Sequence, residues 1–276
     1  MIQQGSAYWL KDKDPNQPHF NLLELASTQR AITNYVKILT GREIPVDFVD
    51  PRGDSMTDGE SIEIASRISH KNVDEVVGLA LHEASHCILT DFKIVKKLGN
   101  VILQDHKYKH LFPNRDHVFL FTNFMEDRRI DDFVYNSAPG YKAYYESMYE
   151  SSFFNDTINK GLKGTEYRTE TWESYMFRII NIFNPNSDLD ALYNLRKIYD
   201  IIDLDHINRL KSTRDSIDVA MEITDIVRAS IIVERMINED NFDQSVLEKS
   251  HKKEGEKNDV SKEKIKNAFQ KQENFI

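Results

Sequence analysis

Apolar residues recur at intervals of three and four over most of the chain, which predicts a mainly helical protein. We expect helices over residues 22–39, 72–92, 118–136, 141–149, 171–183, 189–202 and 215–237. Residues 44–49 and 61–65 instead alternate apolar and polar positions, and the turn signal Asp58-Gly59 lies between them. The pattern therefore predicts an α+β fold that is mainly α, with a small sheet near the N-terminus.

The same pattern predicts how the chain is divided. Residues 1–20 form an N-terminal lead-in broken by prolines, and residues 21–150 form an α+β unit. A helical C-terminal subdomain follows over residues 151–238. Residues 239–276 are polar and highly charged, and we expect a disordered or weakly helical tail because such a stretch buries little apolar surface.

The helix expected over residues 72–92 contains the candidate chemistry. Asn72 is placed to cap it, with Glu75 as the reciprocal partner. His82 and His86 are four residues apart, so both imidazoles lie on one helix face and can converge on one Zn²⁺. Glu83 then lies beside the metal and can take a proton from a water molecule that attacks a carbonyl. This HExxH pattern predicts metal-assisted hydrolysis.

A catalytic zinc usually takes three protein ligands. Our choice for the third is Glu126, on the helix expected over residues 118–136. Asn123 and Arg129 lie three positions to either side and can orient its carboxylate. An ordinary charged helix face is the competing interpretation. The other candidates for the third ligand are the histidines His70, His106, His110 and His117.

Composition and charge restrict the function. The net charge of −9 disfavours binding to nucleic acid, which needs a basic field. No stretch approaches the roughly 20 apolar residues of a membrane span, and the N-terminus lacks the pattern of a signal peptide. The single cysteine, Cys87, fits a reducing compartment. We therefore expect a cytoplasmic protein without membrane or nucleic-acid partners.

HEASH, followed some 40 residues later by a helix with the core Glu-Asp-x-Arg-Ile-Asp, resembles a known family. It is similar to the gluzincin-like metallopeptidase domains associated with von Willebrand factor A modules in bacteria and bacteriophages, including the peptidase-like region of the cobaltochelatase subunit. The Asp58-Gly59 hairpin, Pro139-Gly140 and the charged tail fit this resemblance, which covers about residues 45–150. The Asp-x-Ser-x-Ser motif of the von Willebrand module is not found in the C-terminal part.

The resemblance implies a zincin-like fold, with a small twisted sheet, an active-site helix and a second helix that donates a glutamate. The edge strand of the sheet, by position residues 61–65, would pair with an extended peptide. Thermolysin-like relatives have an aspartate four residues after the glutamate, but that position is Ile130 here. Asp127 and Asp131 do have this spacing, so Asp127 as ligand with Asp131 in support is the alternative.

The expected function is a zinc metallopeptidase that acts on a protein or peptide, with Glu83 as general base. A catalytically silent zinc-binding domain in a complex, such as one with an AAA+ ATPase, is the first alternative, and a zinc hydrolase acting on a non-peptide amide is the second. The candidates for transition-state stabilisation are Tyr141, Tyr144, Tyr145, His117 and Arg129. Aromatic core packing is the competing interpretation for each of the tyrosines.

Overall fold

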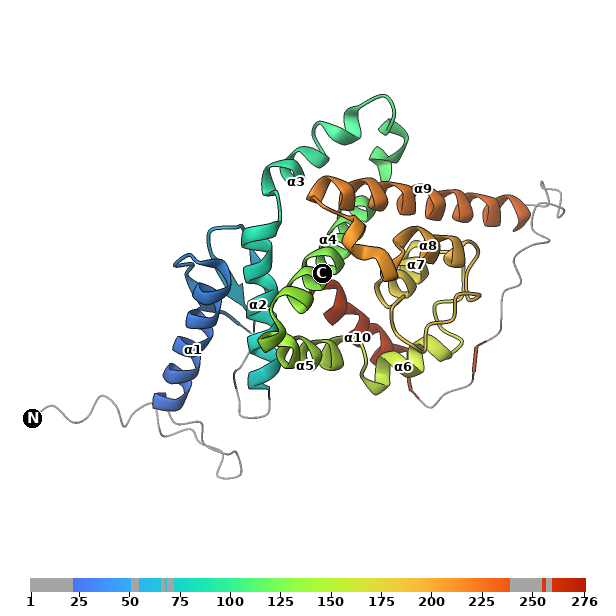
Figure 1. Ribbon diagram of the computed structural model, residues 1–276. Coiled ribbons are helices and arrows are strands. Elements are labelled where there is room, and N and C mark those ends of the chain that lie inside the picture. Colours follow the sequence, from blue (N-terminus) through green and yellow to red (C-terminus); the bar gives the residue numbers. More distant parts are fainter. Residues whose placement is uncertain (1–21, 51–54, 66–67, 69–71, 239–254, 257–259) are drawn as a thin grey trace, which may run out of the picture.

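The computed structural model describes residues 22–50, 55–65, 68, 72–238, 255–256 and 260–276 (Figure 1). The expected lead-in over residues 1–20 lies outside the described residues, as does most of the segment between residues 239 and 259. The α-helices are α1 (Leu22–Thr40), α2 (Val73–Leu89), α3 (Phe92–Leu98), α4 (Arg115–Ser137), α5 (Lys142–Ser152), α6 (Asp156–Lys163), α7 (Trp172–Ile180), α8 (Leu195–Ile202), α9 (Thr213–Asn238) and α10 (Lys262–Glu273). The strands are β1 (Val46–Phe48), β2 (Met56–Thr57) and β3 (Ile62–Ile64). The expectation of a mainly helical protein with a small sheet is confirmed.

The three strands form one mixed sheet in the order β1-β3-β2. β1 runs parallel to β3, whereas β2 runs antiparallel to it. Ile62 and Ile64 of β3 are buried while Glu63 between them is exposed, which is the alternation expected of a strand with one covered face. β3 is thus the central strand, and the expectation that residues 61–65 form the edge was wrong. The edge beside α2 is the short strand β2, which the sequence pattern did not reveal.

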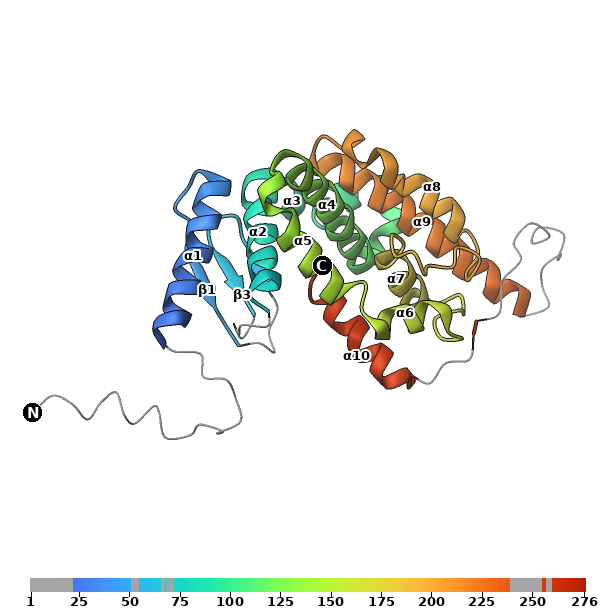
Figure 2. The same ribbon diagram turned by 60° about the horizontal axis from the view of Figure 1, so that its bottom comes forward.

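Helix α2 lies between α1 and α5, next to the sheet (Figure 2). Gly78 permits the close approach of α5, because a Cβ atom there would lie only 2.4 Å from the carbonyl oxygen of Tyr144. At the preceding helix, Gly41 ends α1 with a φ of +66°, a conformation that glycine adopts readily. The side chain of Asn72 makes no capping hydrogen bond, so the expected capping box at the start of α2 is not formed.

The bounds of α1, α4 and α9 agree to within a few residues with those expected from the apolar periodicity. The helix expected to run to residue 92 instead ends at Leu89 as α2, and a separate helix, α3, begins at Phe92. Asp91 causes this break, because its carboxylate accepts hydrogen bonds from the first backbone amides of α3. None of the described helices combines the length and the apolar character that crossing a membrane requires.

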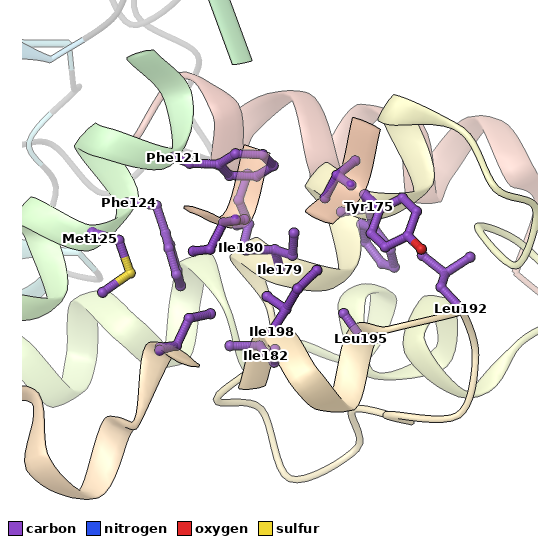
Figure 3. Packing of buried hydrophobic residues seen from close by; sticks show 14 of the residues in the cluster. Phe121, Phe124, Met125, Tyr175, Ile179, Ile180, Ile182, Leu192, Leu195 and Ile198 are labelled. Carbon is purple, nitrogen blue, oxygen red and sulfur yellow. The ribbon is translucent and has the colours of Figure 1, made fainter. Parts of the chain in front are cut away.

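Two main apolar clusters hold the helices together. One joins α1, the sheet, α2 and α5, and the other is built mainly from α4, α7, α8 and α9 (Figure 3). Phe121 and Phe124 of α4 pack in the second cluster with Ile180, Leu195 and Ile223. Helix α4 therefore belongs to the core of both segments that the sequence pattern separates at residue 150.

Helix α10 differs from the expectation of a disordered or weakly helical tail. Ile265 and Phe269 lie one helical turn apart and are buried in the second cluster. Gln272, a turn further on, is also buried and exchanges hydrogen bonds with Asn181. The charged composition concealed this stripe, because three buried positions suffice to dock a helix whose remaining residues are mostly exposed.

Candidate metal centre

Three side chains from α2 and α4 converge on one point. Nε2 of His86 lies 3.2 Å and Nε2 of His82 lies 3.8 Å from Oδ1 of Asp127. Zinc bonds of 2.0–2.1 Å in a tetrahedral arrangement separate two donor atoms by about 3.3–3.4 Å. The observed separations lie on either side of that value, so His82, His86 and Asp127 form a cluster that can hold a metal ion.

The remaining ring nitrogens of the two histidines are held by hydrogen bonds. Nδ1 of His82 lies 2.8 Å from Oδ1 of Asp131, whose other carboxylate oxygen accepts a hydrogen bond from the hydroxyl of Tyr149. Nδ1 of His86 lies 2.9 Å from the hydroxyl of Thr90. Because these partners engage Nδ1, both rings direct Nε2 toward Asp127 and leave it available to bind a metal.

The charge of the site favours a cation. Burial alone would lower the pKa of His82, but the carboxylates of Asp131, Asp127 and Glu83 outweigh it and raise that pKa to about 9. Oδ2 of Asp127 is buried and has no hydrogen-bond partner among the described residues. A buried carboxylate oxygen without a partner is costly in a protein interior, and coordination to a metal removes that cost.

Glu83 lies beside this cluster and lines the same cavity. Its side chain is buried, and burial raises the pKa of the carboxyl group, with the charges of His82 and His86 acting in the opposite direction. None of the described residues donates a hydrogen bond to its carboxylate. The group therefore has the raised proton affinity and the free oxygen atoms that suit a general base.

Glu126, our choice for the third ligand, has different partners. Its carboxylate accepts hydrogen bonds from Nε and Nη2 of Arg129, at 3.0 and 2.6 Å. It also accepts hydrogen bonds from the hydroxyls of Thr90, Thr213 and Ser216, each at 2.8 Å. Although burial opposes the effect, these contacts hold the pKa of Glu126 below its usual value.

The structure therefore places Asp127, and not Glu126, with the two histidines. The cluster corresponds to the alternative set, with Asp127 beside the histidines and Asp131 in support, and does not include our preferred ligand Glu126. Glu126 still acts on the centre indirectly, since the Thr90 hydroxyl that contacts it also contacts His86. Arg129 orients Glu126 as expected, and Glu126 lines the same cavity as the two histidines, but its carboxylate does not join the cluster of His82, His86 and Asp127.

The tyrosines and the histidine expected to stabilise a transition state lie outside the cavity that contains Glu83. Tyr145 is buried and shares a hydrogen bond with Ser85, while Tyr141 and Tyr144 pack around Tyr35. His117 stacks on Trp172 with the ring centroids 3.9 Å apart. None of these four candidates lines the cavity at the metal centre.

Of the other described site residues expected from the sequence, one lies at the cavity that contains Glu83 and the rest do not. Asn123 is exposed on α4 and lines the cavity at the metal centre, so the structure brings it to the site. His106 is exposed, and His110 pairs with Asp225. His70 lies outside the described residues.

The cavity beside the metal centre has a volume of about 150 Å³. Besides Glu83 and both histidines, the residues that line it include Met56 and Thr57 of β2, Thr90 directly after α2, and Phe275 after α10. Sequence reasoning missed all four. Thr90 had one available signal, because a hydroxyl four residues after His86 on a helix is within reach of its ring.

Comparison with family models, curated proteins and solved structures finds no match to this chain. The chemistry of the donor set is therefore the guide to the ion. Two histidines and one carboxylate form the ligand set of many catalytic zinc sites and of non-haem Fe(II) oxygenases. A carboxylate that follows the first histidine directly is typical of the zinc hydrolases, because they need a base beside the metal.

Proposed function

We propose that this protein is a zinc-dependent metallopeptidase of the HExxH type, with a zincin-like arrangement of its active-site helix. The convergence of His82, His86 and Asp127 with Glu83 beside them is the observation that carries this proposal. The ligand set supports zinc, and Glu83 supports hydrolysis because a structural metal site needs no adjacent base. The resemblance to gluzincin-like domains is consistent with it.

In this mechanism each side chain has a defined task. Zinc, when bound, supplies a Lewis acid that polarises water and the substrate carbonyl. Glu83 takes a proton from the attacking water and passes it to the leaving amine. Asp131 and Thr90 hold the imidazoles of His82 and His86 in the tautomer that leaves Nε2 free. Burial of Glu83 and His82 keeps bulk water away and strengthens the interactions of Glu83 with developing charge.

An extended peptide is the substrate that the surroundings of the site suit. The edge strand β2 lies next to the metal centre, since Met56 and Thr57 line the same cavity as Glu83. A peptide added antiparallel to β2 would gain backbone hydrogen bonds and bring its carbonyl groups past the metal centre.

The experiment measures zinc content and proteolysis in parallel. We expect about one zinc per wild-type chain, and cleavage of an unfolded protein such as reduced casein. Glu83→Gln should retain zinc and lose cleavage by about 100-fold or more, the range that a general base contributes. Asp74→Asn, an exposed carboxylate on the same helix, is the matched control and should behave as wild type. Wild-type protein that binds no zinc would refute the proposal.

A second candidate is a metal-binding domain without catalytic activity that works in a complex with a partner. The closed state of the site favours it, because His82 and Asp127 are each only 1% exposed. Stoichiometric zinc without cleavage that depends on Glu83 would support this candidate. What covers His82 and Asp127 therefore bears on the choice between a peptidase and a metal-binding domain without activity.

A further inference from the structure

The aromatic ring of Phe275 covers the metal centre. It stacks on the ring of His82, with centroids 5.0 Å apart and an interplanar angle of 30°. Phe275 and the next residue, Ile276, both line the cavity that contains Glu83 and His86. In Figures 1 and 2, α10 points its C-terminal end toward the region where α2, α4 and α5 meet.

The segment that carries Phe275 is held in place by α10. Ile265 and Phe269 are buried, and the side-chain amide of Gln272 donates hydrogen bonds to Asn181 and to the backbone of Ser152, at 2.7 and 2.9 Å. Phe275 itself makes an edge-to-face contact with the ring of Phe153, in addition to the contact with His82. The ring is therefore seated in a defined place, between the apolar core and the metal ligands.

Phe275 also separates two cavities. The 150 Å³ cavity at the metal centre and a larger one of about 950 Å³ share Phe275 and Ser55 in their walls. The larger cavity runs between the start of α2, the end of α5 and α10, where Glu75, Ser151 and Lys271 line it. If the ring of Phe275 moved away, the two cavities would join into one groove that passes the metal centre.

We propose that Phe275 occupies a subsite for an aromatic side chain of the substrate and keeps the metal centre closed until a substrate displaces it. The face of His82 and the edge of Phe153 form a seat for a planar ring. An extended peptide lying in the joined groove would place one side chain at this seat. The substrate class is thus a polypeptide with an aromatic residue next to the cleaved bond. This inference rests on the proposed function.

The first test does not depend on metal or activity. Diethyl pyrocarbonate modifies accessible, uncharged imidazoles, and peptide mass spectrometry resolves each histidine, so wild type and variant are compared at the same pH. In metal-free full-length protein we expect His82 to react about tenfold faster or more in Phe275→Ala than in wild type, because the ring is its cover. The exposed His206 is the reference and should not change. An unchanged rate at His82 would overturn the inference.

Unfolding of the variant would also accelerate the reaction, so His117 serves as the reporter of the fold. It is stacked on Trp172, far along the chain from Phe275, and its rate should stay at the wild-type value. If Phe275→Ala accelerates His117, then Phe275→Leu replaces it, because leucine keeps apolar contact with Phe153 and removes the stacking ring. Acceleration confined to His82 in either variant supports the inference, and its absence in a folded variant overturns it.

The second test uses zinc-loaded protein and two hydroxamates as probes. Phenylalanine hydroxamate should bind Phe275→Ala about tenfold or more tightly than it binds wild type, because its ring takes the vacated seat. Glycine hydroxamate, which lacks the ring, should gain much less. An equal gain for the two probes would overturn the subsite. Wild-type protein that binds no zinc would refute the proposed function. If the protein binds zinc but His82 reacts no faster in Phe275→Ala than in wild type, only the present inference is refuted.

Discussion

Asp127→Asn and Glu126→Gln should produce opposite defects, although the two residues are neighbours on α4. Each substitution removes one negative charge and conserves the shape of the side chain. Asp127 lies with the two histidines, while Glu126 is bound by Arg129 and three hydroxyls. We expect Asp127→Asn to lose metal with little loss of fold stability, and Glu126→Gln to keep metal with a large loss of stability.

The size of the metal effect follows from the number of ligands. Zinc binding to structural sites contributes about 10–16 kcal/mol, or roughly 2.5–4 kcal/mol for each of four ligands. Asp127→Asn should therefore weaken zinc binding on the order of 10²- to 10³-fold. Glu126 contacts the centre only through Thr90, so Glu126→Gln should weaken binding by about tenfold at most.

For the stability of the metal-free fold, Glu126→Gln should have the larger effect and Asp127→Asn the smaller. Glu126→Gln leaves the buried guanidinium of Arg129 without its charged partner, which costs about 3–5 kcal/mol in comparable sites. Asp127 has one unpartnered oxygen in the metal-free protein, and its other oxygen faces the two histidines. Relief of the buried charge therefore offsets the lost attraction to the histidines, and Asp127→Asn should change stability by about 1 kcal/mol or less.

Competition with a chromophoric chelator measures the zinc affinity, and urea unfolding in excess chelator measures the stability of the metal-free fold. Asp131→Asn should give an intermediate effect, because Asp131 holds His82 in place but does not itself bind the metal. We expect this variant to bind zinc about 10- to 100-fold more weakly than wild type. If Glu126→Gln loses zinc and Asp127→Asn retains it, the assignment of ligands from the geometry is refuted.

Three further predictions concern the fold and its pH dependence. Gly78→Ala should destabilise the protein by about 1–3 kcal/mol in urea unfolding, because the added Cβ meets the backbone of α5. Gly140→Ala is the control and should be nearly neutral, because a Cβ there meets nothing within 4 Å. Equal effects of the two substitutions would contradict the close approach of α5. Arg178→Leu should cost about 3 kcal/mol or more, since three carbonyl groups, two of them in buried hydrogen bonds, lose their donor. A melting temperature within a few degrees of wild type would contradict this. The pKa of His82 is raised from 6.5 to about 9, so its contribution to the stability of the metal-free fold is complete below pH 6.5 and is lost as the pH rises through 9. Thermal unfolding in chelator should show this decline, and Asp131→Asn should flatten it.

The choice between Glu126 and Asp127 illustrates what a local pattern can and cannot decide. Adjacent residues on a helix point about 100° apart, so the rotation of α4 about its axis determines which carboxylate faces α2. That rotation is set by packing against α9, where Thr213 and Ser216 donate hydrogen bonds to Glu126. The four-residue spacing of Asp127 and Asp131 was the signal in the sequence, because a ligand and its supporting group on one helix need that spacing.

The edge strand and the C-terminal helix escaped prediction for a different reason. β2 contains two residues, too few to show an alternation. α10 has a charged composition, and its burial depends on contacts with α6 and α7 that are remote in sequence. Phe275 is visible in the sequence only as an aromatic residue in a polar segment, and nothing local indicates that its ring lies on His82.

The sequence by itself determined the helical class, the small sheet, and the pairing of His82 and His86 with Glu83, because these depend on periodicities within single elements. The tertiary structure decided which carboxylate of α4 joins the histidines, which strand forms the edge, and that Phe275 closes the centre. These depend on the rotation of one helix against another and on contacts between segments far apart in the chain. The free energy of such contacts comes from shape and burial, which no local spacing of residues encodes.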